Sequence, residues 1–157
     1  MKNSIENIEN KTLKEVSVLP IGMAVKLTGV SAQTLRAYER FGLVLPARSN
    51  KKQRLYSFED IDRIKEIRAS IKKHKIGVMA FRSMISMIPC WNIKGCSESD
   101  RASCPVFEGD VAPCWTYKHH NNFCANLSCR DCEVYKSNYN FDRTRKTILK
   151  ELYRSNR

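Results

Sequence analysis

The chain has no cysteine in its first 89 residues and no long apolar run. A helix needs about 20 mostly apolar residues to span a bilayer. Because the chain has no such run, we do not expect a membrane-spanning helix. The polar start MKNSIENIENKTLKE also lacks the apolar core of a secretory signal. With 42% of its 157 residues in the hydrophobic class, the chain can bury one ordinary core or two small ones. We therefore expect a folded protein that stays in the cytosol.

The cysteines are confined to one block of the sequence. All seven lie between residues 90 and 132, and an odd count leaves one thiol over in any scheme made only of disulfides. Because cytosolic thiols are normally kept reduced, metal or cluster ligation is favoured over a disulfide frame. The block therefore predicts an inorganic site rather than a covalent scaffold.

Positive charge lies outside that block. Residues 1–89 carry 17 Lys and Arg against 8 Asp and Glu, residues 90–132 carry 4 against 5, and residues 133–157 carry 7 against 3. A cationic surface of this size favours polyanions such as DNA, or an anionic membrane face. On charge alone, a solvated surface that binds nothing stays open.

Residues 19–42 predict two short helices with a tight turn between them. The stretch IGMAVKLTGV predicts a first helix that ends at Gly29, a residue suited to a positive φ. Ser31 is the expected N-cap of the second helix, which Gly42 ends, and Leu35 and Phe41 are expected in the core. This pattern is typical of a helix-turn-helix, in which the second helix enters the major groove of DNA.

The following segment adds a wing and a longer helix. LVLPARSNKKQRLY has a basic polar tip between apolar flanks, as in a hairpin. In SFEDIDRIKEIRASIKKHK, Ser57 and Asp60 mark a helix start like a capping box, and Ile61, Ile64 and Ile67 keep a helical period. The order predicts a winged helix.

These residues resemble a known family. The string VSAQTLRAYERFGLVLPARSNKKQRLYSFEDIDRIKEIR is similar to the DNA-binding domain of the MerR family of transcription regulators, most of all to the branch with the heat-shock repressors. TLRAYER, GLVLPAR, RLYS and EDIDRI occur in the family's order, and the resemblance covers about residues 19–88. It implies a homodimer that binds double-stranded promoter DNA and meets RNA polymerase there.

The resemblance carries DNA contacts onto two aromatic and three arginine positions of this chain. Side chains near the start of the second helix are best placed to reach base edges, and those of the wing to follow phosphates. A core position for the two tyrosines and plain surface charge for the arginines stay open. The predicted DNA contacts are Gln33, Thr34, Arg36, Tyr38, Arg48, Lys51, Lys52, Arg54 and Tyr56.

Two further helices are expected outside this domain. Residues 76–88 read as a helix in which Met79, Met84 and Met87 are expected in the core. Residues 140–157 read as a C-terminal helix, too short for an independent coiled coil, that either pairs between subunits or packs on its own domain. A homodimer is expected because one winged helix contacts too few bases for useful specificity.

The cysteine block also resembles a known module. Pro-Cys-Trp occurs at 89–91 and again at 113–115, and the block closes with CRDCEVY, in which two cysteines can face one metal ion or cluster edge. The order CW, C, CP, CW, C, CxxCxVY is similar to the two-CW module of bacterial regulatory proteins. The predicted metal ligands are Cys90, Cys96, Cys104, Cys114, Cys124, Cys129 and Cys132.

The chemistry of the block leaves several cofactors open. Four thiolates suffice for one zinc ion or one [4Fe-4S] cluster, and we favour an iron-sulfur cluster shielded by Trp91 and Trp115. The alternatives are Zn²⁺, which His119 or His120 would help to bind, a thiol-disulfide switch without metal, and a metal that only stabilises a small domain. His119 and His120 also read as plain surface residues.

The sequence thus predicts a mainly α protein in four parts. These are a flexible arm (1–17), a MerR-type winged helix-turn-helix (18–88), a small, irregular cysteine-rich sensor module (89–135) and a basic C-terminal helix (136–157). The predicted function is regulation of transcription by a cofactor whose effect passes through Pro89. No nucleophile motif points to an enzyme, and an adaptor that binds another protein instead of DNA is the remaining alternative.

Overall fold

The computed structural model describes residues 14–109 and 111–155. The chain divides into two compact units, Met1–Glu66 and Ile67–Arg157, which we treat separately. Helix α4 (Phe58–His74) crosses this boundary, whereas the sequence placed the boundary after residue 88. Most of the predicted arm lies outside the described residues, and of its last four residues Lys14 and Glu15 are helical.

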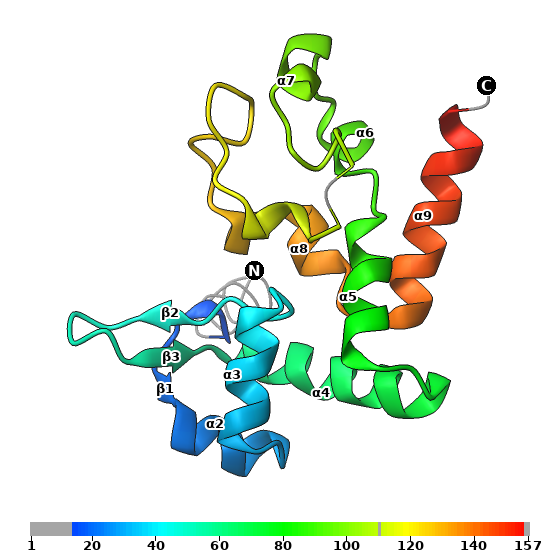
Figure 1. The fold of residues 1–157 in the computed structure, drawn as a ribbon. Coiled ribbons are helices and arrows are strands. Elements are labelled where there is room, and N and C mark those ends of the chain that lie inside the picture. Colours follow the sequence, from blue (N-terminus) through cyan, green and yellow to red (C-terminus); the bar gives the residue numbers. More distant parts are fainter. Residues whose placement is uncertain (1–13, 110, 156–157) are drawn as a thin grey trace, which may run out of the picture. The chain divides into compact units, whose positions relative to one another are not determined.

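The first unit has the predicted winged helix-turn-helix plan (Figure 1). Gly29 ends the first helix with a φ of 65°, and the Ser31 side chain accepts a hydrogen bond from the Thr34 N–H, as expected of an N-cap. Both bonds of the Ser57–Asp60 capping box form, at 2.9 and 3.1 Å. The elements before α4 are β1 (Leu19–Pro20), α2 (Ile21–Thr28), α3 (Ala32–Arg40), β2 (Ala47–Arg48) and β3 (Arg54–Tyr56).

The predicted wing is the hairpin of β2 and β3, and it belongs to a small sheet. The three strands are antiparallel in the order β1-β3-β2, with Arg48 opposite Arg54 and Leu19 opposite Tyr56. β1, which has two residues, was not predicted. Leu35, Leu43 and Val44 are fully buried beneath these elements, and so is Tyr56, one of the predicted DNA contacts.

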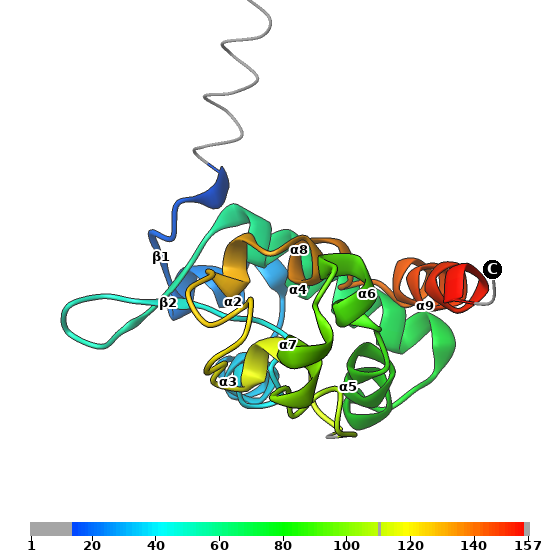
Figure 2. The ribbon, with the colours of Figure 1, turned by 90° about the horizontal axis from the view of Figure 1, so that it is seen from above.

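The second unit consists of helices and 3₁₀ turns joined by loops (Figure 2), and it has a small apolar core. Trp115 packs edge-on against Tyr135, with ring centroids 5.2 Å apart, and Trp91 packs likewise against Phe107. Its elements after α4 are α5 (Val78–Ser86), α6 (Cys90–Lys94), α7 (Glu98–Ala102), the 3₁₀ turns η1 (Cys114–Thr116) and η2 (Cys129–Asp131), α8 (Glu133–Ser137) and α9 (Phe141–Ser155).

The core face of α5 differs from the prediction. Phe81, Ile85 and Ile88, spaced by four and three residues, are almost fully buried, while Met79 and Met87 are 48% and 64% exposed. The two methionines therefore lie outside the core, because the bulkier Phe and Ile side chains take the helical stripe that faces it.

The end of α4 is attached to the start of α9. The backbone N–H of Phe141 donates to the Ser70 hydroxyl at 3.1 Å, and the Phe141 ring stacks on His74 at a centroid distance of 3.9 Å. Lys73 and Asp142 form an ion pair at 2.7 Å. Helix α5 also packs on α9. These contacts explain why α5 and the second half of α4 belong to the same unit as the cysteine region. The sequence left two alternatives for the C-terminal helix, pairing between subunits or packing on its own domain. In this chain α9 packs on its own unit.

Among the helices of the described residues, none has both the length and the apolar content needed to cross a lipid bilayer.

Candidate nucleic-acid interface and cysteine pocket

The outer face of α3 carries a row of exposed polar side chains. Thr34 takes part in the helix cap, because its hydroxyl lies 2.9 Å from the Ser31 hydroxyl. Gln33, Arg36 and Arg40 are exposed, and their spacing of three and four residues puts them on one face. Of the two predicted base readers, Gln33 is thus the one left exposed. Arg40 was missed, although the same spacing marks it in the sequence.

The wing exposes further cations. Arg48, Lys51 and Lys52 are exposed, and Arg54 is partly so. The tip is a tight turn in which the Lys52 N–H donates to the Ser49 carbonyl oxygen at 2.8 Å, with Lys52 at a φ of 60°. The hairpin therefore holds its positive side chains on an ordered turn, which suits contact with a row of phosphates.

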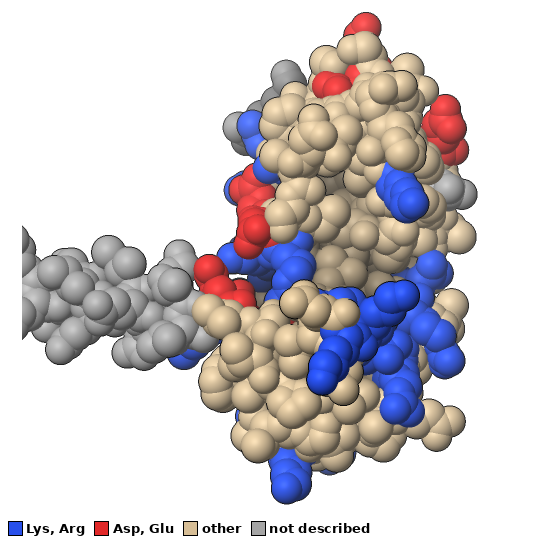
Figure 3. Space-filling view, turned by 90° about the vertical axis from the view of Figure 1, so that its left-hand side faces the viewer, with Lys and Arg blue, Asp and Glu red and all other residues tan. Residues whose placement is uncertain are grey.

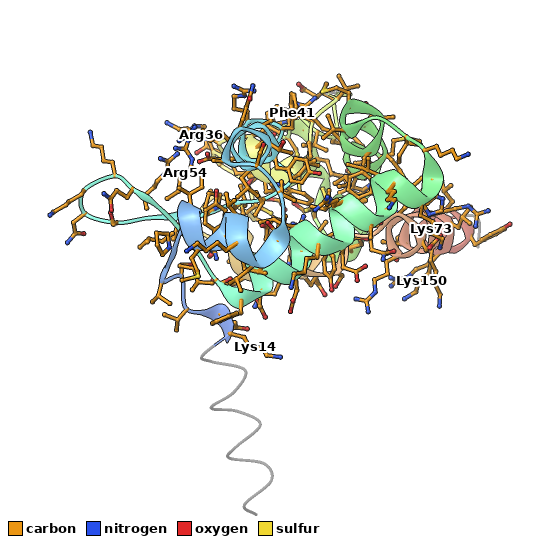
Figure 4. All side chains as sticks on the ribbon, turned by 90° about the horizontal axis from the view of Figure 1, so that it is seen from below. Lys14, Arg36, Phe41, Arg54, Lys73 and Lys150 are labelled. Atoms are coloured by element: carbon orange, nitrogen blue, oxygen red, sulfur yellow. The ribbon has the colours of Figure 1, made fainter. Side chains whose placement is uncertain are left out.

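Glu39 joins α3, the predicted recognition helix, to the wing. One of its carboxylate oxygens accepts a hydrogen bond from Arg48 at 2.5 Å, and the other accepts one from the Arg54 Nε–H. Arg48 also donates to the Lys52 carbonyl oxygen at 3.2 Å. Arg36 is one helical turn before Glu39, and Figure 4 shows Arg36 and Arg54 on the same side of the view. Sequence reasoning missed Glu39.

Two predicted DNA contacts are corrected by the structure. Tyr38 is 6% exposed and Tyr56 is fully buried, so neither ring is on the surface. Both rings fill the core of the first unit, which is the alternative that the sequence left open for the two tyrosines. Burial, and next the Glu39 carboxylate, raise the pKa of Tyr56, so its phenol stays protonated at physiological pH. Among the described residues its hydroxyl has no hydrogen-bond partner.

Replacement of that hydroxyl gives a simple test of the correction. A buried hydroxyl without a partner costs roughly 1–3 kcal/mol, so Tyr56→Phe should leave the free energy of unfolding unchanged or raise it by about 1 kcal/mol. DNA affinity should stay within about twofold of wild type, because the ring remains. Urea unfolding and DNA titration measure the two quantities, and a large loss of affinity at equal stability would restore Tyr56 as a contact.

Exposed positive side chains of the first unit gather on α3 and the wing, where Arg36, Arg40, Arg48, Lys51 and Lys52 are exposed. Figure 3 shows Lys and Arg side chains grouped on the face that it draws. Such a surface attracts a polyanion and raises its association rate. The arrangement therefore suits a contact with the DNA backbone.

Six of the seven cysteines meet at one pocket in the second unit. The pocket has a volume of about 440 Å³ including its opening, and Trp91 forms part of its wall, as predicted, whereas Trp115 does not line it. Cys129, the first residue of η2, does not line it either. The six cysteines come from α6, η1 and the loops between the helices, and are Cys90, Cys96, Cys104, Cys114, Cys124 and Cys132.

The two Pro-Cys-Trp repeats bring one cysteine pair into contact. Pro89 and Pro113 are the N-caps of α6 and η1, so Cys90 and Cys114 are each the first residue of a helical turn. A hydrogen bond between the two sulfur atoms lowers the pKa of Cys90 and raises that of Cys114. The two thiols therefore interact directly, and ionisation of one disfavours ionisation of the other.

Other thiols of the block resist ionisation. Burial, and next the charge of Cys96, raise the pKa of Cys124 to about 11, and burial also raises the pKa of Cys96 and of Cys129. Binding of a metal cation would favour the thiolate form of such a thiol and release its proton. Among the described residues, no three His, Cys, Asp or Glu side chains are arranged to hold a single metal ion.

Protein contacts alone already connect the loops that carry the cysteines. Asp100 accepts hydrogen bonds from the N–H of Phe123 at 2.7 Å and from the N–H of Ser97 at 3.0 Å. This carboxylate joins the segment between Cys96 and Cys104 to the loop of Cys124. A hydrogen bond from the Ser97 hydroxyl, and next these two backbone hydrogen bonds, lower the pKa of Asp100, which therefore stays ionised at neutral pH.

Two charged or ionisable side chains lie beside the sulfur atoms. Lys94 lines the pocket and faces Glu133 at 3.4 Å. Burial acts against its charge, but the Glu133 bond and the nearby cysteines outweigh it and raise the pKa of Lys94. His119 also lines the pocket, where its Nε2 donates to the Cys114 carbonyl oxygen at 2.9 Å and its Nδ1 accepts from Asn122 at 3.4 Å. Both of its ring nitrogens are thus engaged, and His120 is exposed.

Comparison with known proteins finds similarity over residues 19–77. Residues 19–77 match the family described as "MerR HTH family regulatory protein". The chain is 39% identical over 59 residues, or 38% of its length, to the HTH-type transcriptional regulator TnrA of Bacillus subtilis, of which this covers 54%. It is 40% identical over 55 residues to the HTH-type transcriptional regulator GlnR of Bacillus anthracis, covering 35% of this chain and 43% of that protein.

A third relative agrees with the predicted branch. The chain is 31% identical over 74 residues to the putative heat shock protein HspR of Streptomyces coelicolor, covering 47% of this chain and 49% of that protein. The chain thus spans about half the length of the curated relatives it matches. Two of the three are described as transcriptional regulators, and the matched range ends before the cysteine block.

Proposed function

With a MerR-type helix-turn-helix domain at residues 19–77, we propose that this protein is a DNA-binding transcription regulator whose activity depends on an iron-sulfur cluster in the cysteine pocket. The DNA-binding part rests on the domain and on the exposed cations of its recognition helix and wing. The observation that carries the cofactor part is the meeting of six cysteines at one pocket. A homodimer that contacts promoter DNA and RNA polymerase completes the proposal.

The donor set fits a cluster better than a single ion. Four tightly grouped donors hold a zinc ion, with sulfur atoms about 2.3 Å from the metal. No such compact group exists among the described residues, whereas each thiolate on a [4Fe-4S] cluster binds a different iron atom, so the sulfur atoms stand further apart. When bound, the cluster would supply one-electron redox chemistry. Its ligands would be four of the six cysteines that line the pocket.

The protein's own residues would control access to that site. Trp91 and Phe123 line part of the pocket with apolar rings, which limits contact with water. Lys94 places a positive charge beside thiolates, and nearby charge is one of the factors that set a cluster's reduction potential. Asp100 keeps the loops of the pocket together in the free protein.

A continuous helix offers a path from the cofactor to the DNA-binding domain. α4 begins in the first unit and ends in the second, where it is bonded to α9 through Ser70 and Lys73. Pro89, which is buried, leads from the end of α5 into the first cysteine. Coupling of 1–3 kcal/mol along such elements would change DNA affinity roughly 5- to 150-fold.

The test begins with protein purified without oxygen. We expect iron and sulfide in equal amounts, about four of each per chain, with broad visible absorption that bleaches on reduction. Footprinting on the protein's own upstream region should then show a site whose affinity differs several-fold between loaded and stripped protein. Zinc without iron would refute the cluster but not the proposed regulation of transcription. Equal DNA affinity of loaded and stripped protein would remove the sensor role. Absence of any footprint would refute regulation through DNA binding.

A further inference from the structure

Helix α9 presents a strongly positive face that lies outside the matched domain. Its buried side includes Thr144 at 0% exposure and Glu151 at 4%. Of its two acidic residues, Asp142 is paired with Lys73 at 2.7 Å and with His74 at 3.5 Å, and the buried Glu151 lies 3.8 Å from Arg154. The exposed cations of the helix are therefore left largely without counter-charge.

Four of these cations form one row. Arg143, Lys146, Lys150 and Arg154 are all exposed, and only Arg154 has an acidic neighbour, Glu151 at 3.8 Å, among the described residues. Their spacing of three, four and four residues keeps them within about 80° of the helix circumference and spreads them over about 16 Å of its length. We call these four residues the basic stripe.

The end of α4 extends the positive surface. Lys72, Lys73 and Lys75 are exposed there, and the Lys73–Asp142 pair places this end against the first turn of α9. Figure 4 shows Lys73 and Lys150 on the part of the view where α4 ends and α9 runs. Together the two helix segments present a row of cations rather than an isolated charge.

We propose that the basic stripe is a second DNA-contacting surface, which binds backbone phosphates outside the winged helix-turn-helix. The inference rests on the DNA binding proposed above. An elongated row of Lys and Arg side chains is complementary to the regular row of phosphates along a duplex, and each phosphate neutralised releases bound counterions. Such contacts carry no sequence information, so they add affinity and fix the footprint without changing the bases that are read.

The proposal is tested with charge variants of the full-length protein. Lys146→Gln/Lys150→Gln removes two charges from the stripe, and Gln keeps helix propensity and polarity. The matched control Arg145→Gln/Lys118→Gln removes the same charge from two exposed positions off the stripe. Circular dichroism and thermal unfolding establish that both variants fold like wild type. Dissociation constants for a 40-base-pair duplex containing the footprinted site are measured as a function of salt concentration.

We expect the slope of log affinity against log salt to fall by about 2 for the stripe variant, at about 0.9 for each phosphate that the variant no longer neutralises. The fall in affinity near 0.1 M salt should be roughly tenfold or more, while the control should keep the wild-type slope. Equal slopes in the stripe variant and wild type would overturn the inference. Weaker binding to anionic lipid vesicles with unchanged DNA binding would identify a membrane as the partner and would also overturn it.

A variant of the recognition helix separates the two proposals. If Arg36→Ala weakens DNA binding and the stripe variant does not, the regulator stands and the second surface is wrong. If wild type gives no footprint on any part of its upstream region, the proposed regulation of transcription fails, and the stripe proposal fails with it.

Discussion

Cys114→Ser should remove most of the bound iron and sulfide from protein purified without oxygen. Cys114 is in sulfur contact with Cys90, and the charges of Cys132 and Cys129 also act on it, so its thiol lies within the group of cysteines. A serine hydroxyl is a much poorer ligand for iron than a thiolate. We expect at least a fivefold fall in iron per chain, and the DNA affinity of the variant should match that of stripped wild-type protein.

Cys129→Ser is the matched control for this variant. Cys129 belongs to the same block and to the CRDC pair, yet it does not line the pocket. Its replacement should leave the iron content within about 20% of wild type, a margin that analysis of metal content resolves. The prediction is contradicted if Cys114→Ser keeps its iron, or if Cys129→Ser loses as much iron as Cys114→Ser does.

Arg36→Ala should weaken binding to the footprinted DNA site by roughly 5- to 150-fold, the effect of removing about 1–3 kcal/mol that one arginine supplies to binding. Arg36 is exposed on the recognition helix between Gln33 and Arg40. A guanidinium there either pairs with a guanine or grips a phosphate, and the two roles differ in their salt dependence. Removal of a base-reading group lowers affinity for the specific site alone, whereas removal of a phosphate-binding group lowers affinity for all duplexes and reduces the salt slope by about 1.

Lys65→Ala serves as the reference for Arg36→Ala. Lys65 is exposed on α4 in the same unit and outside the recognition helix and wing, so the variant loses the same charge. Its affinity should fall less than about threefold, the general effect of one positive charge at a distance. Titrations of specific and unrelated duplexes at several salt concentrations measure all of these quantities. Equal effects of the two variants would remove Arg36 from the interface.

The features of the first unit that the sequence predicted are local ones. The Ser31 cap and the Ser57–Asp60 capping box each join residues three positions apart, so a short string contains the whole interaction. The positive φ of Gly29 likewise depends on one residue. Together these signals set the limits of the helices, and the match to a regulator domain agrees with them.

Features that depend on tertiary pairing were not predicted. Glu39 meets Arg48 and Arg54 across 9 and 15 residues of sequence, and only the folded hairpin brings them together. Tyr56 reads as a surface residue at the base of a basic wing, but the two-residue strand β1 pairs with β3 beside it and the ring is buried. A strand of two residues leaves almost no periodic signal in a sequence.

The cysteine block shows the same limit. Spacing groups Cys129 with Cys132, because a two-residue gap is typical of metal sites. In the structure Cys132 lines the pocket and Cys129 does not, since the pocket is formed from turns that are distant in sequence. Likewise Met79, Met84 and Met87 were expected in the core, and only the packing of α5 decides that Phe81 and Ile85 take the interior.

The two bonds of the Glu39 carboxylate have a consequence for the affinity of DNA binding. With two arginines bonded to it in the free protein, the hairpin is fixed against the recognition helix before any duplex arrives. Less conformational entropy is then lost on association, so more of the electrostatic attraction appears as affinity. Because a guanidinium has five N–H donors, each arginine can keep its bond to Glu39 while its remaining donors face an incoming phosphate.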